Sequence, residues 1–260
     1  MAPVETADPI VLLHSLGVSG AVWDPLVPAL PAGARVLRPD LRGHGENWDG
    51  RPFEVEEMAA DVARLLDAEG VQAAVIVGLS LGGNVALALA ARHPARVAAL
   101  LLADCTPWYG EGGDDFWSQR ARGFEELGLE ELARVQAERW FGAGFRERRP
   151  DEVERVLAIF RSGDPRGIAA ACRALTGFDA RPWLPGIAAP ALVVGGTADA
   201  AVTAEQMAGL AAAIPAGELA MLQGAGHLAL IERPEVLVEG LQRLRERRAA
   251  AGRAAHMEVS

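Results

Sequence analysis

A serine flanked by glycines, between an apolar run and an alanine-rich run, constrains this chain most strongly. Residues 75–77 are Val-Ile-Val, Ser80 lies between Gly78 and Gly82, and residues 83–93 are rich in alanine and leucine. This is the Gly-x-Ser-x-Gly pattern in the order strand, tight turn, helix. A serine on such a turn projects from the sheet only if the residues two positions away are small, because strand and helix approach closely there. The stretch predicts a nucleophilic Ser80; the structural alternative is a glycine-rich turn in an ordinary strand–helix unit.

Length and charge restrict the classes of protein to consider. The 260 residues suffice for one large α/β domain or two small ones, and half of them are hydrophobic, so a sizeable core can form. The formal net charge of −10 argues against a nucleic-acid partner, which requires a clustered basic surface. No apolar run reaches the roughly 18–20 residues of a membrane span, and the first eight residues lack the pattern of a secretion signal. We expect a cytoplasmic protein with no nucleic-acid or membrane partner; the sequence does not indicate its oligomeric state.

The two cysteines, Cys105 and Cys172, are expected to be reduced core thiols, because a chain of this length does not need a disulfide. A single disulfide between them is the alternative. The cysteines and histidines do not have the spacing of a metal site, so we expect neither a metal nor another cofactor.

Short apolar runs alternate with helical patterns on both sides of one strand-free segment. Runs typical of buried strands occur at 9–14, 34–40, 71–77, 96–103, 191–195 and 218–222. Helical patterns occur at 23–30, 53–69, 83–93, 203–214 and 234–248, followed by a polar tail that we expect to fray. This alternation predicts an α/β fold with a mostly parallel sheet covered by helices on both faces.

The strand-free segment comprises residues 106–182. Glu/Arg-rich helical segments are expected within it at about 114–127, 129–141, 150–162 and 165–178. It holds most of the chain's few aromatic residues, so we expect a helical lid inserted into a core made of residues 1–105 and 183–260. Most of these aromatic side chains should form the core of the lid, and a minority should face a pocket.

An activated serine needs a base, and the base needs an acid that orients it. His227 follows the last expected strand, at the same carboxyl edge of the sheet as Ser80. Asp199 follows the preceding strand, and the order Ser80, Asp199, His227 is the one expected for this architecture. Asp104, which also ends a strand, is the second candidate for the acid. The alternative for His227 is a histidine in a surface loop.

The same architecture predicts an oxyanion hole made of two backbone N–H groups. One belongs to Leu81, directly after the serine, and the other to Leu16, in the loop after the first strand. We expect His14 to brace that loop, His44 to be structural in a tight glycine turn, and His93 to lie at a helix end.

Several motifs together resemble the α/β-hydrolase fold superfamily over nearly the whole chain, and within it the 3-oxoadipate enol-lactone hydrolases. They are His14-Ser15-Leu16-Gly17 with Trp23-Asp24, Arg42-Gly43-His44-Gly45, residues 78–83, Glu138-Arg139-Trp140-Phe141 with Phe145-Arg146, and Gly226-His227 with Ile231-Glu232-Arg233-Pro234. Two features depart from the family. The antiparallel hairpin with which it usually opens looks shortened or absent, and Glu46 stands where the family usually has a small residue.

These observations favour a serine hydrolase that cleaves an ester or a lactone through a Ser-His-Asp triad and an acyl-enzyme. The resemblance implies a small carboxylated substrate similar to an enol-lactone. A cofactor-free lyase, a hydrolase or cyclase of a natural-product pathway, and a non-catalytic ligand receptor are alternatives on the same fold.

The motif at residues 138–141 adds two candidate substrate-binding residues. We expect Trp140 to reach the pocket above Ser80 and Arg139 to help hold a substrate carboxylate. Neighbouring helical residues point about 100° apart, so one of the two must lean along the pocket rim or face away. The alternative is that Trp140 packs within the lid and Arg139 is solvated.

Overall fold

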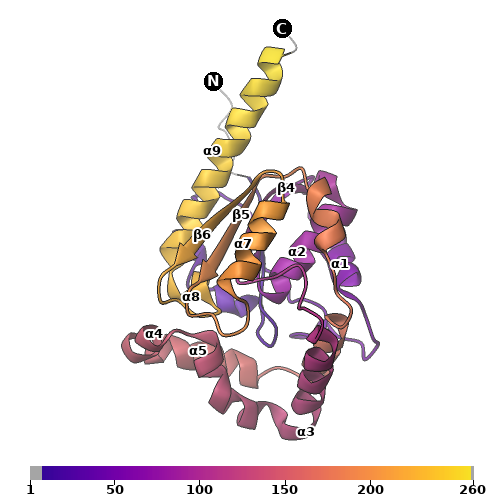
Figure 1. Cartoon of the computed structure of the whole chain (residues 1–260), viewed down its shortest axis with the longest axis vertical. Helices are drawn as coiled ribbons and strands as arrows, with labels where there is room; N and C mark the ends of the chain where they lie inside the picture. Colours follow the sequence, from indigo (N-terminus) through magenta and orange to yellow (C-terminus); the bar gives the residue numbers. More distant parts are fainter. Residues whose placement is uncertain (1–7, 259–260) are drawn as a thin grey trace.

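Six strands form one parallel sheet in the computed structural model, which describes residues 8–258 (Figure 1). They are β1 (Ile10–Leu13), β2 (Val36–Leu37), β3 (Ala74–Leu79), β4 (Val97–Ala103), β5 (Ala191–Gly196) and β6 (Gly217–Leu222), in the spatial order β2-β1-β3-β4-β5-β6. All five neighbouring pairs are parallel. The four central strands are buried almost throughout, which explains their continuous apolar runs. The predicted fold class is confirmed. The opening hairpin, expected to be shortened or absent, concerns residues before Asp8, which lie outside the described residues.

Helices cover both faces of this sheet. Figure 1 shows α9 (Pro234–Glu258) on one face and α1 (Val55–Ala68), α2 (Leu81–Arg92) and α7 (Ala204–Ala213) on the other. α1 and α7 begin with capping boxes, and α8 (Ala229–Glu232) is one short turn before α9. Cys105 and Cys172 are both buried free thiols, as predicted. Within residues 8–258, no helix combines the length and the apolar character needed to cross a membrane.

Two expectations about helix boundaries were wrong. The segment 23–30 does not form one helix; the chain makes two separate 3₁₀ turns, η1 (Gly20–Trp23) and η2 (Val27–Ala29), because Pro25 and Pro28 interrupt the backbone hydrogen bonding of a longer helix. At the other end, α9 does not stop near Arg248 but continues to Glu258. The alanines and arginines of this tail have high helix propensity, which favours continuation over fraying.

Residues 106–182, here called the helical insert, lie beyond the carboxyl edge of the sheet (Figure 1). They contain α3 (Gly113–Trp140), α4 (Ala143–Arg148), α5 (Pro150–Arg161) and α6 (Pro165–Ala174). The two helices expected at 114–127 and 129–141 are both present in α3, which is interrupted at Gly128, where the backbone is not helical (φ 76°, ψ 165°). An isolated bridge between Trp108 and Asp179 brings the two ends of the insert together. Of the two remaining 3₁₀ turns, η3 (Pro94–Arg96) precedes β4, and η4 (Arg181–Gly186) begins at the end of the insert and leads into the core.

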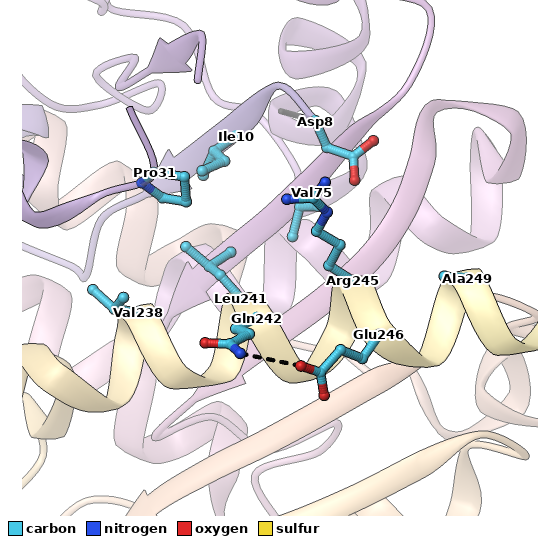
Figure 2. A pocket seen from close by; sticks show the side chains of 10 residues that line it. All are labelled: Asp8, Ile10, Pro31, Val75, Val238, Leu241, Gln242, Arg245, Glu246 and Ala249. Atoms are coloured by element: carbon cyan, nitrogen blue, oxygen red, sulfur yellow. Dashed lines mark hydrogen bonds between the residues drawn. The ribbon is translucent and has the colours of Figure 1, made fainter. Parts of the chain in front are cut away.

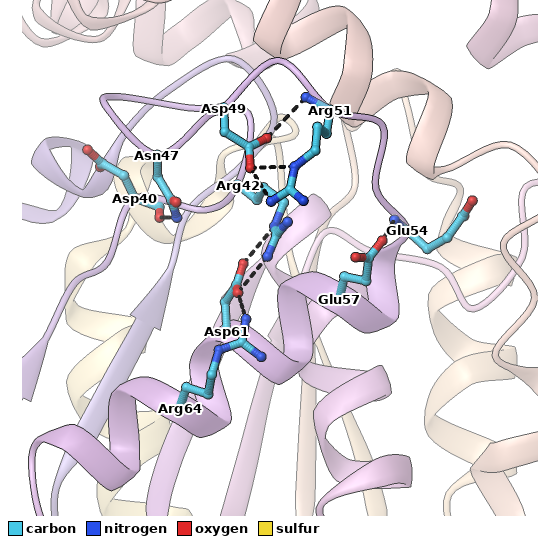
Figure 3. A network of polar contacts seen from close by, with 9 residues as sticks. All are labelled: Asp40, Arg42, Asn47, Asp49, Arg51, Glu54, Glu57, Asp61 and Arg64. Atoms are coloured by element: carbon cyan, nitrogen blue, oxygen red, sulfur yellow. Dashed lines mark hydrogen bonds and ion pairs between the residues drawn. The ribbon is translucent and has the colours of Figure 1, made fainter.

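The loop after β2 is fixed to α1 by an arginine. Figure 3 shows the guanidinium of Arg42 turned toward Asp61, with Nε–Oδ2 and Nη2–Oδ1 distances of 2.9 and 2.8 Å. These hydrogen bonds raise the pKa of Arg42. Asp61 also pairs with Arg64. The bidentate geometry holds the loop that carries His44 against α1.

A hollow of about 440 Å³ lies at the amino ends of the strands, under α9 (Figure 2). Ile10 of β1 and Val75 of β3 face Val238 and Leu241 of α9 across it. Ser80 follows the opposite, carboxyl end of β3, so this hollow is not the candidate site.

Candidate active site

Ser80 occupies a strained turn between β3 and α2. Its backbone has φ 55° and ψ −113°, a conformation that L-residues rarely adopt. A Cβ atom on Gly78 would lie 2.4 Å from the carbonyl oxygen of Gly82, and one on Gly82 would lie 2.2 Å from that of Leu13. The close approach that the sequence predicted for these two glycines is therefore present.

The structure brings His227 and Asp199 to this serine in one line of hydrogen bonds. His227 Nε2 lies 2.8 Å from Ser80 Oγ, and His227 Nδ1 lies 2.9 Å from Asp199 Oδ2. The other oxygen of Asp199 accepts the N–H groups of Ala201 and Val202 at 2.7 and 3.1 Å. These two bonds fix the carboxylate so that Oδ2 faces the imidazole, and the side chain of Asp199 is fully buried. In this geometry Nδ1 carries the ring proton and Nε2 is free to accept a proton from Ser80.

Asp104, the second candidate for the acid, has other partners. Its two carboxylate oxygens accept the N–H groups of Gly196 and Ala229, at 3.0 and 2.9 Å. Burial, reinforced by the nearby charge of Asp199, raises the pKa of Asp104 well above its ordinary value. Asp104 thus ties the loop that carries Asp199 to the loop that carries His227.

His14 and His44 brace the loop after β1. The Nε2 atom of His14 accepts the N–H of Leu41 at 2.8 Å, and that of His44 accepts the N–H of Gly17 at 2.9 Å. Because each Nε2 accepts, each ring carries its proton on Nδ1, which faces a backbone carbonyl. Burial lowers the pKa of His14 to about 4 and that of His44 to about 3, so both rings are neutral at pH 7. Leu16 lies in the loop that these two rings hold.

A small cavity of about 40 Å³ lies beside the hydroxyl of Ser80. Leu16 and His227 line it from the core, and Tyr109, Trp140 and Arg139 line it from the helical insert. Trp140 is buried and meets Phe160 edge-on, whereas Arg139 is only partly buried and extends over the ring of Phe116. Both residues of the predicted pair reach the cavity, because the long arginine side chain leans along the rim from another helix face. Glu46 is exposed and does not line the cavity.

Arg120 is a lining residue that the sequence reasoning missed. Within residues 8–258, no carboxylate lies within ion-pair distance of Arg120 or Arg139. Arg120 donates to the amide oxygen of Gln136 at 3.3 Å, and its guanidinium lies 5.3 Å from the centre of the Phe124 ring. Burial and the neighbouring Arg139 lower the pKa of Arg120 to about 10, so it stays cationic at neutral pH. The available signal was an arginine midway between Phe116 and Phe124, at helical spacing on an otherwise aromatic face.

Residues 8–234 match the family model described as alpha/beta hydrolase fold. The chain belongs to this family. Among its relatives, 3-oxoadipate enol-lactonase 1 of Acinetobacter baylyi is 31% identical over 90% of this chain and 87% of its own length. A pimeloyl-[acyl-carrier protein] methyl ester esterase of Aromatoleum aromaticum is 32% identical over 90% of this chain and 98% of its own. The crystal structure of the enol-lactonase from Burkholderia xenovorans LB400 is 36% identical, covers 92% of both chains and superposes with a TM-score of 0.86.

These relatives confirm that this α/β hydrolase is an ester or lactone hydrolase, and that its resemblance to the enol-lactone hydrolases is real.

Proposed function

We propose that this α/β hydrolase cleaves a small ester or lactone that carries a carboxylate, through an acyl-enzyme on Ser80. The observation that carries the proposal is the unbroken line of hydrogen bonds from Ser80 Oγ through His227 to Asp199. It lies at the wall of a cavity that is also lined by two arginines with no carboxylate partner in the described part of the chain.

The chemistry follows from the proton positions. Ser80 Oγ attacks the carbonyl carbon while its proton passes to His227 Nε2, and Asp199 stabilises the imidazolium through Nδ1–H. Collapse of the tetrahedral intermediate breaks the bond to the leaving oxygen, which takes that proton from Nε2. In a lactone the leaving oxygen stays attached to the acyl group. A water molecule then attacks the ester of Ser80, passes a proton to His227 and releases a carboxylic acid, and Ser80 recovers its proton.

The backbone N–H groups of Leu81 and Leu16 are the proposed oxyanion hole. Leu81 is the first residue of α2, so its N–H has no acceptor within the helix. Leu16 faces the same cavity from the loop that His14 and His44 brace. Two preorganised donors at this position stabilise the charge that develops on the carbonyl oxygen.

Arg120 and Arg139 are the proposed partners of the substrate carboxylate. Burying a cation without a counter-ion destabilises a folded protein, and an anionic ligand would remove that cost. Trp140 would form the apolar wall against which the acyl group lies. This assignment extends the expectation for Arg139 by a second cation.

The helical insert would act as the lid of this site. The cavity beside Ser80 holds about 40 Å³, and a larger groove of about 370 Å³ within the insert shares Phe116, Arg120 and Arg139 with it. These three side chains therefore separate the groove from the serine, and we propose that the groove is the route of entry.

Three measurements test the proposal. A fluorophosphonate probe should label wild-type protein at Ser80 and leave Ser80→Ala unlabelled. A panel of lactones and small esters, with and without a carboxylate, should give the highest kcat/KM for the carboxylated members. In ¹⁸O-labelled water the product acid should gain one labelled oxygen, whereas an elimination would leave it unlabelled. Failure to label Ser80 together with no turnover on the panel would refute the proposal.

A further inference from the structure

A buried carboxylate joins the loop of His227 to the helical insert. Glu232 of α8 is 5% exposed, and its Oε1 accepts the N–H groups of Gly226 and Gly142, both at 2.8 Å. Gly226 directly precedes His227, and Gly142 follows Trp140 by two residues. One oxygen atom thus connects the backbone beside the base to the backbone at the end of α3; α8 lies next to α4 in Figure 1.

The two backbones also meet directly. The N–H of Leu228 donates to the carbonyl oxygen of Trp140 at 2.9 Å. A Cβ atom on Gly226 would lie 2.7 Å from Gly142 N, and one on Gly142 would lie 2.2 Å from the carbonyl oxygen of Gly224, so the backbones approach too closely for a side chain. The loop is therefore bonded to the insert on both sides of His227.

These contacts bear on the reaction because proton transfer needs His227 Nε2 within hydrogen-bond reach of Ser80 Oγ, where it now lies at 2.8 Å. A misplacement of about 1 Å is enough to lower a rate by roughly 100-fold. Asp199 orients the ring of His227, but the backbone on either side of the ring is held by the insert.

We propose that Glu232 is a positioning residue that couples docking of the helical insert to the placement of His227. The base then lies in line with Ser80 while residues 140–142 are docked against its loop. This inference rests on the role proposed above for His227 and extends it, because it makes the reactivity of the triad depend on the position of the lid.

Substitutions at Glu232 separate this role from a purely structural one. Glu232→Gln keeps an oxygen in the place of Oε1, whereas Glu232→Leu removes the acceptor from both N–H groups. Glu235→Gln, three residues on and exposed, is the matched control for loss of the charge. A carboxylate that only stabilised the fold would change the unfolding temperature but not the kcat of the folded molecules.

A second test changes a residue of the helical insert. Gly142→Ala leaves Glu232 and His227 unchanged, but its methyl group would push residues 140–142 away from the loop. Gly144→Ala is its control, because a Cβ there would meet only the end of the Arg148 side chain, at 3.0 Å. If Glu232→Leu does not fold, the comparison of Gly142→Ala with Gly144→Ala tests the proposal.

Two readouts are measured on each full-length variant well below its unfolding temperature. The first is kcat and KM on a small ester, and the second is the proton NMR resonance of His227 Nδ1–H, which reports ring placement without turnover. Glu232→Leu and Gly142→Ala should lower kcat at least tenfold and should shift or broaden the resonance. Glu232→Gln, Glu235→Gln and Gly144→Ala should match the wild type.

Wild-type kcat with an unchanged resonance in Glu232→Leu, whatever its unfolding temperature, would overturn the inference. An equal loss in Glu232→Gln would also overturn it, because the acceptor oxygen is retained there. A wild-type protein that hydrolyses no ester would count against the proposed function instead, and the resonance would still test the coupling.

Discussion

The ring of His44 accepts a hydrogen bond from the backbone N–H of Gly17, and that bond exists only while the ring is neutral. A proton on Nε2 would place two N–H groups against each other. His14 makes the equivalent bond to Leu41, and the two rings pack edge-on with their centroids 4.9 Å apart. The loop that carries Leu16 is therefore braced by two histidines that must stay unprotonated.

Acid should destabilise the fold through these rings. Between pH 7 and pH 5 the unfolded chain binds protons at histidines of ordinary pKa, while the folded chain, with His14 at about 4 and His44 at about 3, does not. Stability is therefore full above pH 7 and is lost as the pH falls; each ring should cost about 2 kcal/mol at pH 5. Urea unfolding of wild type and His44→Gln at both pH values would measure this. An equal pH dependence in the two proteins would contradict it.

Asp199 and Asp104 should respond differently to substitution by asparagine. Asp199→Asn should lower kcat by several orders of magnitude, because the amide no longer stabilises the imidazolium or selects the Nδ1–H tautomer. Asp104→Asn should change kcat less than tenfold and mainly lower the unfolding temperature, because one backbone N–H loses its acceptor. Steady-state kinetics with thermal unfolding would separate the two. Near-full activity in Asp199→Asn with loss in Asp104→Asn would reverse the assignment.

Arg120 should lower the stability of the fold and contribute to recognition of a substrate carboxylate. Arg120→Gln and Arg139→Gln should each lower kcat/KM on a carboxylated ester by roughly 10- to 100-fold, the worth of a charge-assisted hydrogen bond, with a smaller effect on the neutral methyl ester. Arg120→Met should also raise the unfolding temperature, because it removes a partly buried cation that has no carboxylate partner among the described residues. The exposed Arg122→Gln is the control. Equal slowing of both substrates would exclude a role in reading the carboxylate.

Phe116 should set the length of acyl group that the enzyme accepts. It borders both the small cavity and the larger groove, and it is 40% exposed, so Phe116→Ala leaves the core of the fold unchanged. Removal of the ring joins the two spaces, so kcat/KM for hexanoyl relative to acetyl esters should rise severalfold. Leu127→Ala, at another exposed apolar position of α3, should leave the ratio unchanged. An unchanged ratio in Phe116→Ala would mean that the acyl group does not pass this ring.

Ser80 should be a site of stored backbone strain. Ser80→Ala and Ser80→Gly should both be inactive, but glycine adopts φ 55° without strain. Ser80→Gly should therefore be at least as stable as Ser80→Ala, despite the roughly 0.5–1 kcal/mol that glycine usually costs through backbone entropy. Thermal unfolding of the two variants would show this. A markedly less stable glycine variant would mean that the turn is not strained.

The core was predictable because its signals are local. The short apolar runs follow from the period of a buried parallel strand, and the glycines around Ser80 and the order of the proposed triad residues follow from the space and the chain order that a nucleophilic turn needs. The local sequence did not decide whether Asp199 or Asp104 is the acid that faces His227. Both end strands, and only the three-dimensional arrangement directs one to the imidazole and the other to backbone N–H groups.

Arg120, the second arginine at the cavity, was not predicted for a different reason. Arg120 lies in a segment with many solvated arginines, and the sequence does not reveal which of them lacks a carboxylate nearby. The bond between Glu232 and Gly142 spans 90 positions, so no periodicity could indicate it. The single helix at 23–30 was predicted wrongly because two prolines interrupt its hydrogen bonding. The end of α9 was placed too early because the alanines after Arg248 favour continuation of the helix.

A helical insert taken from a relative and placed in this chain would contact the core where Gly142 lies against Gly224 and Gly226. A donor with a side chain at position 142 would carry a methyl group to within 2.2 Å of a host carbonyl, and the graft would sit displaced however well its helices packed. α6 meets the core under a second restriction of this kind, because a Cβ atom on Gly167 would lie 2.5 Å from the carbonyl oxygen of Gly43. Diversification of substrate range by recombination within residues 106–182 must therefore keep Gly142, Gly226 and Glu232 at one contact with the core, and Gly43 and Gly167 at the other.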